Sequence, residues 1–177
     1  MSNITIRPAT LEDRTLIRSI SERTWPSTYG HIISQEQIDF MLDWMYSDAS
    51  LAEQIEKGHQ FFIANSNGAD IGFCSTSKEV ETSSNDENTP APNSIAYKLN
   101  KLYVLPMAHG TGAGKALLQK AIDTAQAQGA SSLFLQVNKH NNAYSFYLKQ
   151  GFVKEAEFKF DIGNGFYMDD YVMRLSF

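Results

Sequence analysis

The chain has 177 residues, of which 42% are hydrophobic and 20% are charged, as in an ordinary globular domain. We therefore predict a single domain over residues 1–177. No stretch approaches the roughly 20 apolar residues of a membrane-spanning helix, and a net charge of −5 argues against nucleic acid, because phosphate binding requires a surplus of Lys and Arg. We expect neither a membrane nor a nucleic acid as partner.

The single cysteine, Cys74, excludes an intramolecular disulfide and a multi-cysteine zinc site. Its apolar neighbours predict a buried small side chain rather than a nucleophile. The four histidines lack the i,i+4 spacing of a helical metal site, so we expect no metal. The first residues already alternate as a strand does, which leaves no room for a secretory signal, and we expect a cytoplasmic location.

The N-terminal region predicts a short strand and then helices. Residues 4–7 alternate apolar and polar side chains before a proline. Thr10, three residues before Asp13, forms a capping pattern for a first helix, which we expect to end near Trp25-Pro26. Ser34, with Gln37 three places on, predicts a capping box for a second helix. A third short helix is expected over residues 51–57.

Strand patterns then take over. Residues 61–64 and 70–76 flank a polar turn and predict an antiparallel hairpin. Residues 81–94 have no apolar periodicity, and we expect a mobile loop inserted between neighbouring strands.

The C-terminal half alternates strands and helices before it ends in a hairpin. We expect a central strand at 95–106, a helix at 112–128 closed by Gly129, a strand at 133–137 and a helix at 141–150 capped by Gly151, with the last hairpin turning at 163–165. This order predicts a mixed α/β layer architecture.

A glycine-rich turn joins the central strand to the helix after it. Residues 109–115 read His-Gly-Thr-Gly-Ala-Gly-Lys. Glycines let backbone N–H groups approach a ligand closely, and a helix start adds unpaired donors, so this junction can bind a pyrophosphate. A Walker loop is disfavoured because Ala116 stands where its Ser or Thr is required. A dinucleotide fold is disfavoured because the turn comes late in the chain. A connector that merely needs positive φ remains an alternative.

A second block follows the turn at residues 135–152, which read Leu-Gln-Val-Asn-Lys-His-Asn-Asn-Ala-Tyr-Ser-Phe-Tyr-Leu-Lys-Gln-Gly-Phe. Together with Leu102-Tyr103-Val104 and the turn, this block resembles the Gcn5-related N-acetyltransferase (GNAT) superfamily. The resemblance is strongest over residues 95–155. It implies a mostly antiparallel twisted sheet with a splayed central strand pair, flanked by helices, and acetyl-CoA as the acyl donor.

The resemblance also implies roles for individual residues. The strand would receive the pantetheine arm, the turn would bind the pyrophosphate, and an asparagine of the second block would reach the cofactor. The cofactor-binding residues expected on this basis are Leu102, Tyr103, Val104, His109, Gly110, Thr111, Gly112, Ala113, Gly114, Lys115, Asn138 and Asn141.

Some of these positions have alternatives. His109 stands where the family has Gln or Arg and lacks the arginine fork, so we rely on the backbone of the turn more than on this side chain. Lys115 fits a solvated helix lysine equally well, and Asn141 fits a helix cap.

The resemblance places Tyr147 where the family tyrosine protonates the departing CoA thiolate. A phenol near the sulfur can stabilise or protonate that leaving group. We expect Tyr147 to be catalytic and Phe146 to be the core member of the pair.

The amine must lose a proton before it attacks, because an alkylammonium with a pKa of about 10.4 is protonated at neutral pH. Many family members carry a glutamate for this purpose where this chain has Lys98. A water chain is one substitute, and the candidate carboxylates are Glu79, Glu81, Asp169 and Asp170.

We expect aromatic side chains and a carboxylate to form the acceptor site, because both kinds of group attract a cationic amine. We expect Trp25, Tyr29 and Asp170 to bind substrate, with core packing as the alternative role of the aromatics. The end of the chain has a weaker likeness to bacterial spermidine/spermine-type acetyltransferases. The prediction is an N-acetyltransferase acting on a small amine or polyamine by direct attack. Alternatives are acetylation of a protein N-terminal amine and a non-catalytic acyl-CoA-binding module. A homodimer is also expected, since homodimers are frequent among relatives.

Overall fold

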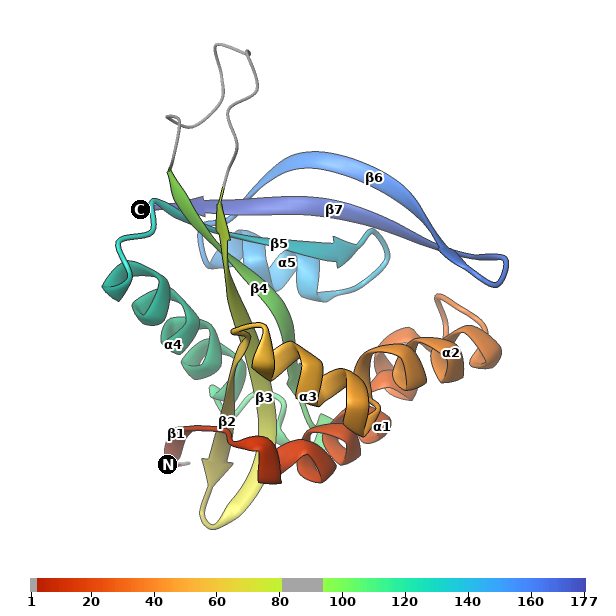
Figure 1. Ribbon diagram of the computed structural model, residues 1–177, viewed down its shortest axis with the longest axis horizontal. Coiled ribbons are helices and arrows are strands. Elements are labelled where there is room, and N and C mark those ends of the chain that lie inside the picture. The colour runs from red at the N-terminus through yellow and green to blue at the C-terminus, as the bar shows by residue number, and fades with distance from the viewer. Residues whose placement is uncertain (1–2, 81–93) are drawn as a thin grey trace. The chain divides into compact units, whose positions relative to one another are not determined.

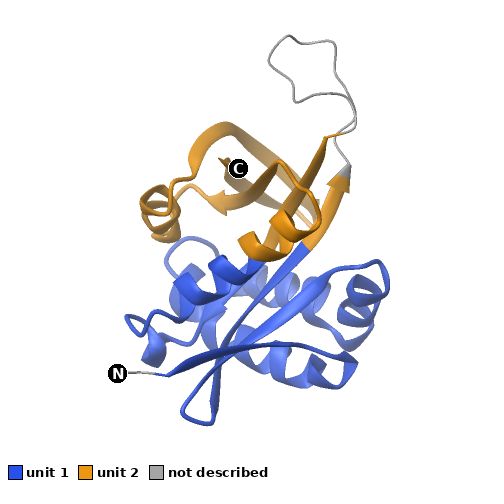
Figure 2. Ribbon diagram, turned by 90° about the vertical axis from the view of Figure 1, so that its left-hand side faces the viewer, with its two compact units in different colours: residues 1–76, 101–121 blue, residues 77–100, 122–177 orange. Residues whose placement is uncertain are grey.

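The computed structural model describes residues 3–80 and 94–177. They form two compact units, which are coloured separately in Figure 2. Unit 1 consists of residues 1–76 and 101–121, and unit 2 consists of residues 77–100 and 122–177. The predicted loop at 81–94 lies outside the described residues except for Ser94. The single domain stays a prediction.

The elements follow the predicted order along the chain (Figure 1). They are β1 (Ile4–Pro8), a 3₁₀ turn (Leu11–Asp13), α1 (Arg14–Tyr29), α2 (Gln35–Tyr46), α3 (Asp48–Glu56), β2 (Gln60–Ser66), β3 (Ala69–Val80), β4 (Ile95–Val104), a 3₁₀ turn (Pro106–Ala108), α4 (Ala113–Ala127), β5 (Ser132–Asn138), α5 (Ala143–Lys149), β6 (Val153–Gly163) and β7 (Phe166–Ser176).

The described strands hydrogen-bond in the order β1-β2-β3-β4-β5-β7-β6. β4 and β5 are parallel, whereas β5 with β7 and β6 with β7 are antiparallel. The parallel register covers only Ala96–Leu99 against Ser132–Leu135, although β4 continues to Val104. A mostly antiparallel sheet with a central pair that separates confirms the predicted fold class.

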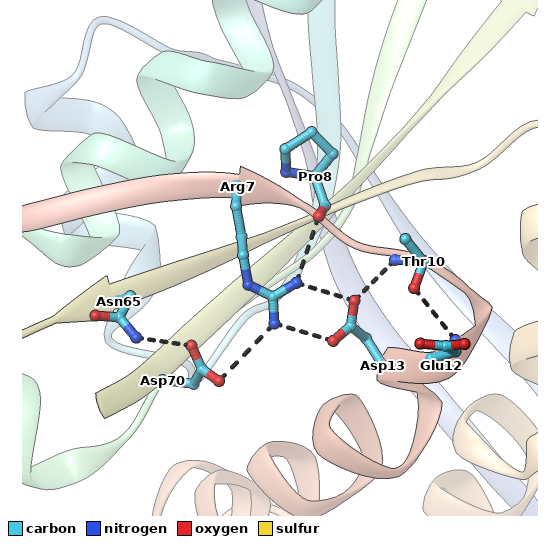
Figure 3. Close-up of polar contacts among 7 residues, drawn as sticks. All are labelled: Arg7, Pro8, Thr10, Glu12, Asp13, Asn65 and Asp70. Atoms are coloured by element: carbon cyan, nitrogen blue, oxygen red, sulfur yellow. Dashed lines mark hydrogen bonds and ion pairs between the residues drawn. The ribbon is translucent and has the colours of Figure 1, made fainter. Parts of the chain in front are cut away.

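The start of unit 1 is fixed by the predicted cap. Thr10 Oγ1 accepts a hydrogen bond from the Glu12 amide, and Asp13 accepts one from the Thr10 amide at 2.8 Å. Figure 3 shows that Asp13 also accepts two hydrogen bonds from Arg7, at 2.9 and 3.0 Å. The hydrogen bonds from Arg7 lower the pKa of the Asp13 carboxyl. Strand β1 is thereby joined to the turn that begins the helical segment.

The predicted end of the first helix was wrong. α1 continues through Pro26 to Tyr29, and the carbonyl of Pro26 accepts a hydrogen bond from the Gly30 amide at 2.9 Å. A proline removes one backbone donor, but Pro26 is exposed while Trp25 beside it is 1% exposed. We infer that burial of the tryptophan stabilises the last turn enough to offset the missing hydrogen bond.

The next predicted helices agree with the structure. The Ser34 side chain caps α2 by accepting a hydrogen bond from the Gln37 amide at 3.1 Å. The Gln37 side chain donates to the Met41 sulfur at 3.9 Å. α1, α2 and α3 pack against one another within unit 1.

Successive side chains of β2 and β3 point to opposite faces of the strands, and both faces carry apolar side chains. On one face Cys74 is fully buried, and its Sγ lies 3.6 Å from the Leu117 carbonyl of α4. On the other face the ring of Phe73 packs edge-on against Tyr46 of α2. Strands covered on both faces read as continuous apolar runs, as residues 61–64 and 71–74 do. The predicted burial of Cys74 is confirmed.

Both predicted hairpins are present, and the same turn chemistry forms them. Asn67-Gly68 joins β2 to β3, and Asn164-Gly165 joins β6 to β7, with positive φ at all four residues. Two-residue turns of this kind match the twist of the flanking strands. In unit 2 the β7 residue Tyr171 packs on Tyr144 of α5, with ring centroids 4.9 Å apart.

Candidate functional site

The glycine turn lies in unit 1 between the end of β4 and the start of α4. Gly110 and Gly112 have φ of +81° and +89°, values that L side chains rarely adopt. A Cβ at either position would meet nothing within 4 Å. Backbone conformation, and not crowding, is therefore what requires glycine at these two positions.

The turn leaves backbone donors available at the helix start. Ala116 makes the first helical hydrogen bond of α4, to the Gly112 carbonyl at 3.0 Å. The amides of Gly114 and Lys115 precede that bond and have no intrahelical acceptor. The Thr111 side chain donates to the Ala108 carbonyl at 2.6 Å, and the Ala113 amide lies 3.4 Å from the Thr111 hydroxyl. This arrangement favours an anion in front of the helix.

The two side chains that could add to the turn are both exposed. His109 Nε2 lies 3.0 Å from the Val104 carbonyl, a hydrogen bond in which the ring nitrogen donates. The imidazole therefore ties the turn to the end of β4. Lys115 is exposed on the first turn of α4. Contact of either side chain with the cofactor stays a prediction.

The predicted pantetheine strand, Leu102 to Val104, is the end of β4. A Cβ on Gly72 of β3 would lie 2.7 Å from the Tyr103 carbonyl oxygen, so only glycine permits this close approach. The Leu105 amide donates to the Ile71 carbonyl at 2.8 Å. β3 therefore holds one edge of the strand. Gly72 was not predicted as part of the site, although an isolated glycine in a strand is a known signal for close backbone approach.

The predicted acceptor aromatics gather around Tyr103 in unit 1. The hydroxyls of Tyr29 and Tyr103 are hydrogen-bonded at 2.9 Å. Trp25 packs against both rings, with centroids 4.5 and 5.8 Å away. Since Trp25 is 1% exposed and Tyr29 is half-buried, burial favours Trp25 as a support for the two tyrosines. Substrate contact by either residue stays a prediction.

A buried cation lies in the same strand and was not foreseen. Lys101 is 9% exposed, and its Nζ donates to Gln54 of α3 at 2.6 Å. The ammonium lies 5.6 Å and 5.7 Å from the ring centroids of Tyr46 and Phe61. Ring faces and an amide oxygen together stabilise a buried charge.

Unit 2 holds the other predicted residues. Tyr147 on α5 is 6% exposed, and its ring packs against Phe146 and Phe152 with centroids 5.3 and 5.6 Å away. Phe146 is only half-buried. The expectation that Phe146 is the core member was therefore wrong: the tyrosine is the more buried of the two.

The two asparagines both support local backbone. Asn138 Oδ1 accepts a hydrogen bond from the His140 amide, and Asn141 Oδ1 accepts one from the Ala143 amide, each at 2.9 Å. The bond to Ala143 satisfies a donor at the start of α5, which is the capping role that we left open for Asn141. A cofactor contact by either amide stays a prediction.

Asp170 is the most unusual titratable group of unit 2. It lies on β7 and is 3% exposed. Burial, with a smaller contribution from the charge of Asp169, raises the pKa of Asp170 to about 6, and Lys98 opposes that shift. A carboxyl with a pKa this close to neutrality can both release and accept a proton at working pH.

The structure thus distributes the predicted residues over two sets. The turn, the end of β4 and the aromatics belong to unit 1, and Tyr147, Asn138, Asn141 and Asp170 belong to unit 2. Within residues 3–80 and 94–177, no group of three or more His, Cys, Asp or Glu could hold a metal ion. No helix of the described chain is long and apolar enough to cross a membrane.

Comparison with known proteins decides the family. The model of the acetyltransferase (GNAT) domain matches residues 31–168. The chain belongs to the GNAT acetyltransferase family. The predicted family, fold class and enzyme class, an N-acetyltransferase, are confirmed.

Two relatives by sequence cover nearly the whole chain. An uncharacterised N-acetyltransferase of Mycobacterium tuberculosis is 30% identical over 92% of this chain and 97% of that protein. A spermidine N(1)-acetyltransferase of Thermoplasma acidophilum is 27% identical over 86% of this chain and 90% of that protein.

Solved structures share the fold over the same extent. The PaiA N-acetyltransferase of Thermoplasma acidophilum, crystallised in complex with coenzyme A, has a TM-score of 0.76 and 25% identity, and the alignment covers 99% of both chains. A Gcn5-related N-acetyltransferase of Rhodopseudomonas palustris has a TM-score of 0.78 and 24% identity, covering 100% of this chain and 98% of the other.

Proposed function

We propose that the protein transfers an acetyl group from acetyl-CoA to a primary amine, with a small amine or polyamine as the favoured acceptor. The supporting observation is the turn of residues 109–115, whose backbone donors at the start of α4 suit the pyrophosphate of CoA. A relative of similar length was crystallised with coenzyme A, and another is a spermidine acetyltransferase.

The cofactor would be held mainly by the backbone. Leu102 to Val104 would offer peptide groups to the pantetheine arm, and the amides of the turn would bind the pyrophosphate. Asn138 or Asn141 would add a side-chain amide. Lys115 would add charge attraction from the exposed first turn of α4.

Tyr147 would act as the general acid. When the amine attacks the thioester, the carbon–sulfur bond breaks and the sulfur leaves as a thiolate. The Tyr147 phenol would give this sulfur a proton, and the proton lost by the new amide nitrogen would restore the phenol. Direct attack needs no nucleophilic side chain. Burial raises the pKa of the Cys74 thiol to about 12, which leaves it inert.

The residues proposed to bind the acceptor are Tyr29, with Trp25 packed against its ring as a support, and Asp170. Rings and a carboxylate both attract an ammonium group, which supports a cationic acceptor. The proposal includes a homodimer and a cytoplasmic location.

The test follows free thiol in mixtures of purified protein, acetyl-CoA and an acceptor. The panel contains spermidine, spermine, putrescine, an aminoglycoside and a peptide with an N-terminal alanine. The buried Cys74 keeps the thiol background of the protein low. Thiol release with a polyamine supports the proposal, and release with the peptide alone would move the acceptor to a protein N-terminus.

Binding measurements separate the remaining outcomes. Calorimetry with CoA and with ATP in the presence of magnesium would detect a cofactor site without turnover. Tight CoA binding with no thiol release across the panel would favour a non-catalytic acyl-CoA-binding module. ATP binding without CoA binding would overturn the assignment of the turn.

A further inference from the structure

One carboxyl group of unit 2 occupies a place where a charge is costly. Asp170 is 3% exposed, and it is the one buried acidic side chain of the described residues. The charges that act on its carboxylate are those of Asp169 and Lys98. Burying an ionisable carboxyl disfavours its charged form, so the burial of Asp170 calls for an explanation in function.

The strand registers define what surrounds this carboxylate. Asn138 of β5 and Phe158 of β6 lie directly opposite Asp170, and opposite residues share a face of the sheet. Lys98 of β4 is in register with Phe134, which is four residues from Asn138 and hence on that face too. One face of unit 2 therefore carries an ammonium group, an amide and the buried carboxylate.

The charges around Asp170 are few. The charge of Lys98 on β4 lowers the pKa of Asp170, while the charge of Asp169 beside it on β7 raises that pKa. Lys139 Nζ lies 3.1 Å from the Asp169 carboxylate and partly neutralises that charge. The residues opposite on β5 and β6, Asn138 and Phe158, do not titrate. With a pKa raised to about 6, Asp170 can take up and release a proton near neutral pH.

The other candidate carboxylates are less suited to proton transfer. Asp169 forms an ion pair with Lys139, which favours its charged form over the protonated form. The Glu79 side chain accepts a hydrogen bond from the Ser77 hydroxyl at 3.5 Å and is half-buried. Glu81 lies outside the described residues.

We propose that Asp170 accepts the proton that the acceptor ammonium must lose before it attacks, and that Lys98 keeps the carboxylate ionised. This inference rests on the proposed function. The N–H bond of the ammonium breaks, its proton passes to the Asp170 carboxylate, and the freed lone pair forms the carbon–nitrogen bond. Asp170 then releases that proton to solvent, which balances the single proton that the overall reaction produces.

The test compares Asp170→Asn with wild type, using spermidine and acetyl-CoA and following thiol release between pH 5 and 10. Asn has the shape of Asp but cannot accept the proton. We expect kcat/KM to fall by about 10²-fold or more at pH 7. The wild-type profile should fall on the acidic side as Asp170 becomes protonated, and that limb should be absent from the variant.

Two features of the pH profile of kcat/KM distinguish loss of the proton acceptor from structural damage by the substitution. The defect of Asp170→Asn should shrink toward pH 10, where free amine is abundant in solution. Lys98→Met should move the acidic limb of an otherwise active enzyme to higher pH, since the cation no longer favours the carboxylate. Asp43→Asn is the matched control, because Asp43 is exposed on α2, and it should leave the profile unchanged.

The outcomes separate this inference from the proposed function. Wild-type thiol release together with an Asp170→Asn variant that keeps the rate and the acidic limb would overturn the role of Asp170 alone. Absence of thiol release from wild type with every amine would overturn the proposed function, and this inference with it. Calorimetric CoA binding by Asp170→Asn equal to wild type is expected, and its loss would indicate a structural role.

Discussion

The buried carboxylate of Asp170 should reduce the stability of the fold at neutral pH, and replacing it should reverse this effect. Its pKa is 3.8 in the unfolded chain and about 6 in the folded chain. At 1.36 kcal/mol per pKa unit, the difference of roughly two units corresponds to about 3 kcal/mol. The folded-state pKa is raised, so the protonated carboxyl favours the fold, and stability is lost as pH rises from about 4 through 6.

Asp170→Asn removes this titration while keeping the shape of the side chain. The free energy of unfolding of the variant minus that of wild type should therefore increase with pH, by about 2 kcal/mol between pH 4.5 and pH 7. Asn also leaves a buried amide, which shifts the difference by the same amount at every pH and does not change its slope.

Urea unfolding followed by far-ultraviolet circular dichroism at each pH measures this difference. Asp43→Asn removes an exposed carboxylate and should give a difference close to zero at every pH. A constant difference between Asp170→Asn and wild type across pH 4.5 to 7 would refute the reasoning, because a shifted pKa must appear as a pH-dependent stability. A variant that gains stability at neutral pH while it loses turnover would mark Asp170 as a functional group.

Three further predictions concern the remaining sites. Tyr147→Phe should lower kcat by about 10²-fold or more with CoA affinity unchanged, whereas Tyr144→Phe on the same helix should not; stopped-time thiol assays and calorimetry check both. Gly112→Ala and Gly129→Ala should each cost about 1–2 kcal/mol in urea unfolding, because both positions have positive φ, but only the change in the turn should weaken CoA binding. Native Cys74 should resist iodoacetamide at pH 8 and react after denaturation, since its thiol is buried with a pKa of about 12; rapid native labelling seen by mass spectrometry would contradict this burial.

The sequence predicted local structure well where a short-range signal governs it. Thr10 and Ser34 cap helical segments as their spacing indicates, and Asn-Gly pairs form both hairpin turns. Pro26 shows the limit of such signals. A proline predicts a helix end from its missing N–H, but the neighbouring Trp25 is buried, and tertiary packing outweighed the local penalty.

Long-range contacts explain what the sequence could not predict. Gly72 is required by the carbonyl of Tyr103, thirty-one positions along the chain, and nothing near Gly72 signals that partner. The burial of Lys101 depends in the same way on Gln54 and on ring faces from other elements. The residue types in the sequence identified candidates for catalysis and binding, but the environment of each residue depends on which strands pair.

Asp169 and Asp170 show this most clearly, because they are adjacent and chemically identical. Their side chains point to opposite faces of β7, so Asp169 forms an ion pair with Lys139 and stays partly exposed, whereas Asp170 is buried. Both residues are equally good candidates for a proton acceptor in the sequence. The strand register distinguishes the two carboxylates, because it places Asp170 opposite Asn138 and on the same face of the sheet as Lys98. A carboxylate whose charge is costly to bury is the one suited to take up a proton.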